Sequence, residues 1–400
     1  MGARSRNLLG RGCFIPLALL VGCTGTLANN GSVSDASSPS DTADAALVVD
    51  APPLDVADVA DVAPPLDTPP ALDDAGCWAG SLTPVVNGRP LRSATGLAAS
   101  GQRYALLATY GEGNYLVMLD EQARVVGEPR RVEGAPRVVS FDDGFGLVSE
   151  TGVEPVDLTG APTGTRIAVR LDPWSVKRIG DTVVGLRPIE TDGATPRYAL
   201  VQMPSHGRGP VTETGVVSPE GWQVTGVGVS RMLLRRVASD GTGLTQLALA
   251  TTSGLTPYPD VRDELVVVND SLWIPERDEW MLVGASRVPG GLLHDYILRF
   301  WRVSASGQVT SGGFGQDHGY VLNRLVRGRD GAFAAFAVET LGARLTALYE
   351  PNGRRATHPD IRWSDFYGAW SPQMDRYVLA HTPATRETDG VLGLRCFPSR

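Results

Sequence analysis

The chain has 400 residues, of which 42% are hydrophobic and 20% are charged, and its formal net charge at pH 7 is −8. This charge is unevenly distributed: residues 24–76 hold ten aspartates and no lysine or arginine, whereas residues 77–400 hold 34 acidic and 33 basic residues. The C-terminal part therefore lacks the basic field that attracts nucleic acid, and no nucleic-acid partner is expected.

The N-terminus combines positive charge with a short apolar run. Arg4, Arg6 and Arg11 precede or flank the run FIPLALLV, which occupies residues 14–21. A membrane-spanning helix needs about 20 apolar residues, so this run is too short to span but has the length of a signal-peptide core. No other run approaches that length, and we expect residues 1–22 to be a signal peptide.

The residues Leu20-Val21-Gly22-Cys23, at the end of this run, resemble the lipobox of bacterial lipoproteins. The resemblance implies export, cleavage before Cys23, and lipid attachment to the Cys23 sulfur, which would make the membrane a partner of the protein. Thr24 stands where an aspartate retains such lipoproteins in the inner membrane, which favours the outer membrane of the cell envelope. An ordinary signal peptide followed by a chance cysteine is the alternative.

Residues 23–76 are predicted to be a disordered linker that carries the lipidated cysteine. The segment contains no aromatic residue and repeats prolines and aspartates in PPLDVADVADVAPPLDTPPALDD. Repelling carboxylates and scattered prolines oppose collapse into a core. No Asp-x-Asp-x-Asp-Gly loop is present, so the acidic residues do not indicate a calcium site.

The composition changes at Cys77, after which short apolar segments are typical of β-strands. All eight tryptophans lie in residues 77–400, and runs of five to eight residues such as 104–109 and 296–303 are separated by Gly, Pro, Asn and Asp. No long helical periodicity competes with them. We expect residues 77–400 to form one all-β domain that is a monomer.

A repeated turn divides this domain. Gly160, Gly207, Gly254, Gly307 and Gly353 each end a similar turn, at intervals of 47, 47, 53 and 46 residues, and Ala123 takes the place of the glycine one interval earlier. A second motif, W-x-P-x-x-D-x-aromatic, begins at Trp273 and again at Trp370. Four-stranded units of about 45 residues are typical of β-propellers.

The W-x-P-x-x-D motif is similar to the first hairpin of a blade in WD-repeat-like and TolB-like β-propellers. Together with the repeat of about 45 residues, this predicts a β-propeller of seven four-stranded blades, with six or eight as alternatives. The blades are predicted near residues 93–136, 137–171, 172–219, 220–262, 263–317, 318–364 and 365–397. The chain lacks the specific marks of the WD, kelch and sialidase repeats, so no particular family is indicated.

Two cysteines remain once Cys13 leaves with the signal peptide and Cys23 takes lipid. Cys77 and Cys396 stand at opposite ends of the domain, and in an oxidising compartment they are predicted to form one disulfide; two buried free thiols are the alternative. The last predicted blade ends on its third strand. If residues 77–90 supply the missing outer strand, both termini share one blade and the two sulfurs come within bonding reach.

No sequence motif supports a cofactor, a metal site or a catalytic residue. The five histidines show no metal-ligand spacing. The segment beginning at Gly284 fails the Gly-x-Ser-x-Gly nucleophile pattern at its last position. Asp142 and Asp143 fall beside Gly144 in a predicted turn, where such residues are ordinary turn chemistry.

Propellers commonly bind ligands through the loops that join second to third strands and blade to blade. Polar side chains in or beside these loops are the candidate binding-face residues: Tyr110, Asn114, Glu190, Asp192, Arg197, His294, Asp295, His381, Arg386 and Glu387.

The preferred hypothesis is an exported lipoprotein whose propeller is a non-catalytic binding or scaffolding module, with a protein or glycan partner in the envelope. The alternative is a propeller-type glycan hydrolase or lyase, which predicts carboxylates, arginines or tyrosines clustered at the mouth of the central channel. A structural component of the envelope is a third hypothesis.

Overall fold

The structure is a computed structural model that describes residues 77, 82–110, 113–134, 137–189, 196–237, 245–258, 267–287, 296–316, 320–339, 344–349, 355–357, 365–382 and 392–398. The predicted signal peptide, Cys23 and the linker lie outside these residues. All described residues belong to one compact unit, Pro69–Arg400.

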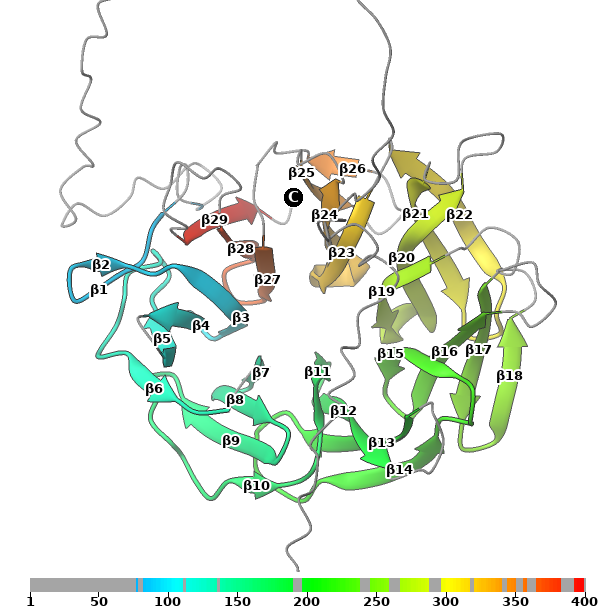
Figure 1. The fold of residues 1–400 in the computed structure, drawn as a ribbon, viewed down its shortest axis with the longest axis horizontal. Coiled ribbons are helices and arrows are strands. Elements are labelled where there is room, and N and C mark those ends of the chain that lie inside the picture. The colour runs from blue at the N-terminus through cyan, green and yellow to red at the C-terminus, as the bar shows by residue number, and fades with distance from the viewer. Residues whose placement is uncertain are drawn as a thin grey trace, which may run out of the picture. The chain divides into compact units, whose positions relative to one another are not determined.

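The described residues form antiparallel sheets that follow one another round a ring (Figure 1). Six sheets have four strands and one has three, and within each of these seven the strands lie side by side in chain order. Two short 3-10 helices, η3 (Pro275–Arg277) and η4 (Arg329–Gly331), join strands. No helix in the described part of the chain is long and apolar enough to cross a membrane.

The strands take equivalent places in the sheets. The first strands are β3 (Ser93–Ser100), β7 (Arg137–Phe141), β11 (Asp172–Ile179), β15 (Gln223–Gly228), β19 (Val267–Ile274), β23 (Tyr320–Arg327) and β27 (Asp365–Ser371). The second strands are β4 (Arg103–Tyr110), β8 (Gly144–Ser149), β12 (Thr182–Ile189), β16 (Arg231–Val237), β20 (Glu279–Arg287), β24 (Phe333–Glu339) and β28 (Arg376–Thr382). The third strands are β5 (Gly113–Leu119), β9 (Gly152–Asp157), β13 (Arg197–Pro204), β17 (Thr245–Thr251), β21 (Tyr296–Ser304), β25 (Arg344–Tyr349) and β29 (Gly393–Pro398). The fourth strands are β6 (Arg130–Val132), β10 (Ile167–Ala168), β14 (Thr212–Val217), β18 (Gly254–Tyr258), β22 (Val309–Gln316) and β26 (Arg355–Thr357).

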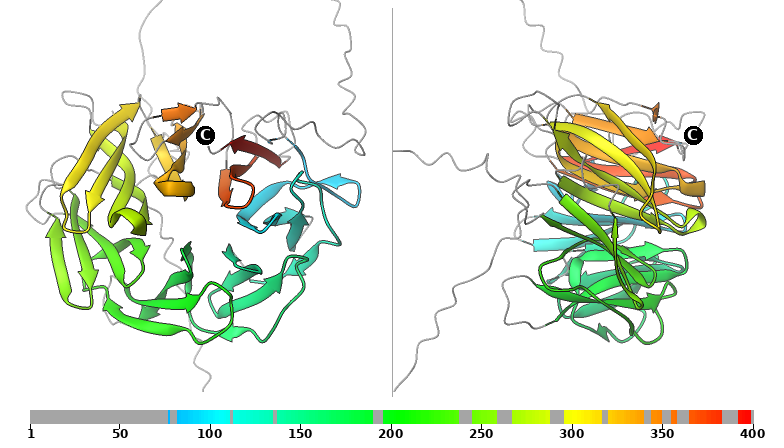
Figure 2. Two further views of the ribbon diagram at one scale, coloured as in Figure 1. Left: turned by 180° about the vertical axis from the view of Figure 1, so that it is seen from behind. Right: turned by 90° about the vertical axis from the view of Figure 1, so that its right-hand side faces the viewer.

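The first strands line the centre of the ring and close it. Each first strand contacts the first strand of the next sheet, and β27, in the last sheet, contacts β3, in the first. The view from behind shows the same circular order (Figure 2). A closed circle of radially arranged four-stranded sheets is the architecture of a β-propeller, so the predicted all-β propeller is confirmed.

The apolar cores lie between neighbouring sheets, which explains why the middle strands read as continuous apolar runs. In β4, Leu106 and Ala108 pack toward the last sheet, whereas Ala105 and Leu107 pack toward the second sheet. Successive side chains of a strand point to opposite faces, and here both faces are covered. Each blade is therefore stabilised by its two neighbours rather than by a core of its own.

The repeated turns connect third to fourth strands, as hairpins at the predicted period. Gly160, Gly207, Gly254 and Gly307 all have positive φ, between 66° and 124°. Ala123 has a φ of 60°, so it adopts the left-handed conformation that the other turns give to glycine. Gly353 lies outside the described residues.

The tryptophan motif also forms the predicted hairpins. Trp273 on β19 is the register partner of Trp280 on β20, and their ring centroids are 5.0 Å apart. Trp370 on β27 pairs in the same way with Tyr377 on β28. Each motif thus joins the first and second strands of a blade.

The prediction of seven four-stranded blades is wrong, because only six four-stranded sheets are present in the described residues. The sheet β27-β28-β29 has three strands, and Leu82 joins its outer edge only as an isolated antiparallel bridge. The N–H of Leu82 donates to the Leu394 oxygen at 2.8 Å, and the Leu394 N–H donates back at 2.6 Å. Pro84 has no N–H to extend this ladder, and the chain turns instead into the hairpin β1 (Val85–Val86) and β2 (Arg89–Pro90).

The two ends of the domain nevertheless meet as predicted. The sulfur atoms of Cys77 and Cys396 are 2.00 Å apart and their Cα atoms 5.4 Å apart, so the pair is capable of forming the predicted disulfide. Both cysteines are buried in one apolar cluster with Leu91 and Leu394. This cluster joins the N-terminal segment, the first sheet and the last sheet.

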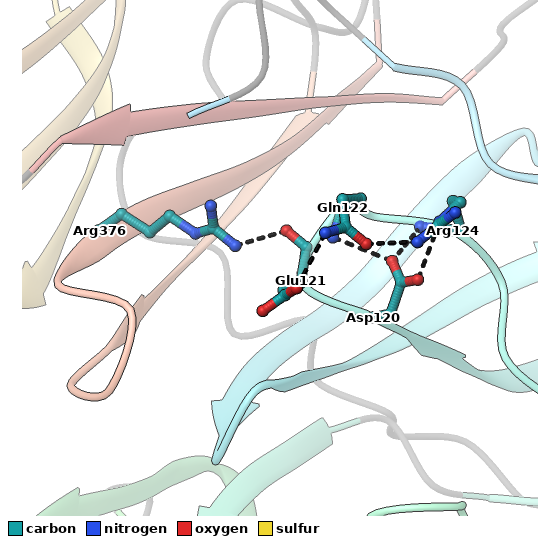
Figure 3. Close-up of polar contacts among 5 residues, drawn as sticks. All are labelled: Asp120, Glu121, Gln122, Arg124 and Arg376. Carbon is teal, nitrogen blue, oxygen red and sulfur yellow. Dashed lines mark hydrogen bonds and ion pairs between the residues drawn. The ribbon is translucent and has the colours of Figure 1, made fainter. Parts of the chain in front are cut away.

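A buried arginine further fastens the last sheet to the first (Figure 3). The Arg376 Nε donates to the Tyr104 hydroxyl at 3.0 Å, and its Nη2 donates to the backbone oxygen of Glu121. Burial raises the pKa of Tyr104 to about 12, although the positive charge of Arg376 acts in the opposite direction. Asp120, in the same turn as Glu121, accepts hydrogen bonds from the backbone N–H groups of Gln122 and Arg124 at 2.9 Å.

Candidate binding site at the ring axis

Four of the sequence-predicted binding-face residues are described: Tyr110 and Asn114 lie on the paired strands β4 and β5 of one sheet, whereas Arg197 and His381 lie in two other sheets. Tyr110 is the last residue of β4. The exposed Asn114 accepts a hydrogen bond from Thr109 in its own sheet at 3.4 Å. The Arg197 Nε donates to the Ser218 oxygen at 3.1 Å, after the fourth strand of its own sheet. Six further candidates lie outside the described residues: Glu190, Asp192, His294, Asp295, Arg386 and Glu387.

The prediction that His381 belongs to a binding-face loop is wrong. His381 lies within β28, opposite Phe366 and Gly393, and only 5% of it is exposed. Burial lowers the pKa of His381 to about 4, and the charge of Arg395 contributes to the shift. The apolar strand continues past the residue where the sequence suggested that the loop begins.

A different group of residues meets at the ring axis, at the beginnings of first strands from three sheets. We name Arg137 of β7, Asp172 and Trp174 of β11, and Tyr367 of β27 the axial cluster. The Arg137 Cζ lies 3.4 Å from the centroid of the Trp174 ring and 5.2 Å from that of Tyr367. Because β3 stands between β7 and β27, Arg137 reaches past an entire blade to approach Tyr367.

Trp174 is unusual among the large apolar side chains because 55% of it is exposed. Only two other large hydrophobic residues in the described part of the chain are exposed, Val217 and Leu255, and both lie on outer strands. A tryptophan that stays half in water while it stacks on an arginine is typical of the aromatic anchors of binding surfaces.

Asp172 supplies the negative charge of the axial cluster. Its Oδ1 accepts a hydrogen bond from the Trp174 N–H at 3.0 Å, which fixes the backbone at the tryptophan. Burial and the nearby charge of Glu150 raise the pKa of Asp172, whereas the Trp174 hydrogen bond and the charge of Arg137 act against the rise. The cluster thus combines one cation, one partly desolvated carboxyl group and two aromatic rings.

A second set of polar contacts lies further along β11 and links first strands of three sheets. Lys177, the single lysine of the sequence, donates from Nζ to the Asp270 Oδ1 and to the Ser271 oxygen, both at 2.9 Å. The other Asp270 oxygen accepts the Leu325 N–H at 2.9 Å. These contacts join β11, β19 and β23 across β15, and they neutralise Lys177 within the protein.

An open hollow of about 410 Å³ adjoins the axial cluster along the chain. It is lined by residues from the second sheet and its exit segment: Glu150, Thr151, Ala168, Val169 and Arg170. The Leu171 N–H donates to the Glu150 oxygen at 3.3 Å, so the hollow and Asp172 share one short stretch of backbone. In the described part of the chain, no group of three or more His, Cys, Asp or Glu side chains could hold a metal ion.

The binding-face loops predicted from the sequence lie at the same end of the blades as the axial cluster, but the sequence reasoning did not identify the cluster itself. Arg137, Asp172 and Trp174 stand at the start of the blades predicted to begin at residues 137 and 172. The candidate site residues, however, were chosen from the loops. An aromatic and two charged residues at the start of an inner strand, where apolar packing is the norm, are the signal that could have found the site. Tyr367 joins it only through the closure of the ring.

No protein-family model matches this chain, and no curated protein matches it either. One similar solved structure is the acylaminoacyl peptidase of Pyrococcus horikoshii, with 10% sequence identity and a TM-score of 0.49. The likeness covers 76% of this chain and 51% of that chain, so this chain spans about half the length of the peptidase. A likeness this distant says nothing about activity. The class that the structure itself defines is the β-propeller.

Proposed function

We propose that the protein is an envelope lipoprotein whose propeller is a binding module, and that the axial cluster is its ligand site. The observation that carries the proposal is the exposed Trp174, held against Arg137 where three blades meet. A large exposed aromatic surface in water is unfavourable, and burying it against a ligand contributes about 25 cal/mol for each Å² removed from water.

The geometry supports binding because the cluster is held by rigid strands. Arg137 and Tyr367 lie on first strands and are paired with Val148 and Ala380 of the neighbouring strands. Trp174 lies in the irregular stretch of β11 between Asp172 and Lys177, where its N–H is held by the Asp172 carboxylate. Side chains held in place before binding lose little conformational entropy when the ligand arrives. Polar and aromatic groups converge there, as is usual in ligand sites.

The test is retention of envelope glycans and proteins on the immobilised full-length protein, compared with the Trp174→Ala variant. We expect at least a tenfold loss of retained material in Trp174→Ala, since aromatic anchors dominate such sites. Leu255→Ala, which removes another exposed apolar side chain on an outer strand, is the matched control and should retain the ligand. Equal retention by Trp174→Ala and the unmodified protein would overturn the proposal.

Glycan hydrolysis or cleavage at the same site is a second candidate, favoured by the raised pKa of Asp172 near the charge of Glu150. A carboxyl group with a raised pKa holds its proton to higher pH than an ordinary aspartate, as a general acid requires. Under this alternative, Asp172→Asn abolishes release of reducing ends from a bound glycan while binding persists. Under the preferred function, the unmodified protein releases none.

The membrane anchor is part of the proposal and is supported by the sequence alone. Export, lipid on Cys23 and placement in the outer membrane follow from the lipobox-like Leu20-Val21-Gly22-Cys23. Metabolic labelling with a fatty-acid analogue should mark the unmodified protein but not Cys23→Ala. Labelling that persists in Cys23→Ala, or a mature N-terminus elsewhere than Cys23, would contradict the anchor.

A further inference from the structure

The backbone of β11 bulges at the place where it presents Trp174. Asp172 pairs with Leu186 of β12 and Lys177 pairs with Val184, so the stretch between Asp172 and Lys177 leaves the regular ladder. A bulge turns a side chain away from its regular direction, and bulges are frequent beside functional sites. This bulge contains Trp174, of which 55% is exposed.

Hydrogen bonds hold the bulge in one shape. The Asp172 Oδ1 accepts the Trp174 N–H at 3.0 Å, and the Ser175 hydroxyl donates to the Asp172 backbone oxygen at 2.7 Å. The Ser175 oxygen in turn accepts the Leu186 N–H at 2.8 Å. Trp174 is therefore exposed on a fixed backbone, and a ligand that contacts it does not have to order the strand first.

The arginines of the site are already engaged within the protein. The Arg137 Cζ lies 3.4 Å from the centroid of the Trp174 ring, and the Arg137 Nε and Nη2 are buried. Arg137 and Arg170 both have further contacts inside the protein. Their formal charges also cancel those of Asp172 and Glu150, so an external cation or anion gains little attraction here.

The exposed part of Trp174 favours a ligand with a flat apolar face. The face of an aromatic ring carries negative electrostatic potential and attracts weakly positive C–H groups. A saccharide ring presents such C–H groups on one face and hydroxyl groups at its edge. Packing that face against Trp174 removes apolar surface from water and requires no charge on the ligand.

The neighbouring hollow of about 410 Å³ supplies acceptors for hydroxyl groups. Glu150, in its lining, is exposed, and an ionised carboxylate accepts hydrogen bonds but donates none. A sugar hydroxyl can turn to donate to it, whereas the backbone carbonyl of a peptide can only accept. The hollow also has an apolar part, formed by Ala168 and Val169. This mixture favours a saccharide over a peptide.

Resting on the proposed function, we infer that the ligand is an uncharged oligosaccharide. One sugar ring packs its C–H face against the exposed part of Trp174. The adjoining ring enters the hollow, where its hydroxyl groups donate to Glu150. Recognition depends on aromatic surface and hydrogen bonds rather than on charge, so ionic strength has little effect on the affinity.

The test is calorimetric titration of the full-length protein with two matched pairs of linear hexasaccharides. The N-acetylglucosamine hexamer is uncharged and the glucosamine hexamer is its cationic counterpart. The methyl ester of hexagalacturonate is uncharged and hexagalacturonate is its anionic counterpart. We expect an uncharged hexamer to bind about tenfold more tightly than its charged counterpart, with the same affinity at low and high salt.

Variants of the protein show which side chains carry that binding. Trp174→Ala should weaken it by about tenfold or more, whereas Trp174→Tyr keeps an aromatic face and should lose less. Glu150→Ala removes one acceptor and should weaken it by about threefold. Leu255→Ala is the matched control and should leave it unchanged. The unfolding temperature of each variant shows whether it is folded.

The outcomes that overturn the inference are distinguishable from failure of the proposed function. Equal or tighter binding of a charged hexamer, or binding that Trp174→Ala leaves unchanged, contradicts the uncharged oligosaccharide. Failure of both uncharged hexamers, while envelope material is still retained through Trp174, contradicts only the inference, and retained protein then identifies a peptide ligand. Failure of both, together with retention that does not depend on Trp174, contradicts the proposed function as well.

Discussion

At the scale of single residues, His381 shows how burial sets a charge state. The residue lies in the middle strand of the last blade, covered on both faces, and burial lowers its pKa to about 4. A histidine in the unfolded chain has a pKa near 6.5, so between these values the unfolded chain binds more protons than the folded one.

His381 should therefore make the protein less stable in mild acid. Its contribution is fully present above about pH 6.5 and is lost as the pH falls toward about 4, a change on the order of 3 kcal/mol at most. Urea unfolding midpoints measured between pH 7.5 and 4.5 should fall less steeply in His381→Gln than in the unmodified protein. An identical slope in His381→Gln contradicts the prediction.

Gly307 illustrates a second residue-scale effect, the close approach of a turn to a buried ring. Its φ is 87°, and a Cβ at this position would lie 2.3 Å from the Tyr258 Cδ1. Gly307→Ala should lower the free energy of unfolding by roughly 2–4 kcal/mol, through left-handed strain and overpacking together. Gly180→Ala, with a φ of 58° and no neighbouring atom within 4 Å, should cost only about 1 kcal/mol. Equal losses in denaturant unfolding would mean that the contact with Tyr258 has no effect.

At the scale of elements, buried contacts between blades differ from exposed contacts within a single turn. Arg376 of β28 is buried and bonds to Tyr104 of β4 and to the backbone of Glu121 after β5. Arg124 pairs with Asp120 at 2.9 Å within a single turn, and about half of its side chain is in water. Figure 3 shows both arginines beside the same turn.

Arg376 should matter far more to stability than Arg124. Arg376→Met leaves the Tyr104 hydroxyl and a backbone oxygen without this donor, and we expect a loss of roughly 2–4 kcal/mol. Arg124→Gln removes an exposed ion pair and should cost less than about 1 kcal/mol. Chemical unfolding of the two variants gives both values, and a loss in Arg376→Met no larger than in Arg124→Gln contradicts the assignment.

At the scale of the whole molecule, the ring closes through its two ends. Leu82 bridges to Leu394, and Cys77 lies at bonding distance from Cys396, so the first and last segments share the outer part of one sheet. Residues 319 positions apart in sequence meet there. A covalent bond at this place would keep the circle from opening.

The cysteine pair should be oxidised in the exported protein and should stabilise it. Closing so long a loop lowers the entropy of the unfolded chain by an amount worth about 5 kcal/mol, an upper estimate. Thiol labelling under denaturing conditions should detect neither Cys77 nor Cys396 until a reductant is added. The Cys77→Ser, Cys396→Ser double variant should unfold at lower denaturant concentration, and reductant should not change its midpoint. Free thiols at both positions in the exported protein would refute the bond.

Much of the ring could be predicted from the sequence, because its signals are local. The turns at Gly160, Gly207, Gly254 and Gly307 require positive φ. Between these turns, apolar residues alternate with polar ones in strands buried on one face and form continuous runs in strands buried on both faces. The predicted blade starts at 93, 137 and 172 coincide with β3, β7 and β11. The predicted number of four-stranded blades was wrong because of the last sheet. Its fourth strand would have to come from the distant N-terminal segment, and Pro84 stops that segment from pairing further along β29.

The candidate site was much less predictable. Of the described residues chosen by their polarity, only Tyr110 and Asn114 lie in the same sheet, and His381 is a core residue. Trp174 and Tyr367 have no relation in the sequence that marks them as neighbours. Their common contact, Arg137, lies in a third blade.

The sequence by itself determined the repeat, the strands, the turns and the two terminal cysteines, because each depends on residues close together in the chain or on a simple count. Only the tertiary structure decided which side chains face one another at the axis. Closure of the ring brings the starts of β7, β11 and β27 to the same end of the ring axis, and that arrangement arises from packing between blades rather than from any local preference.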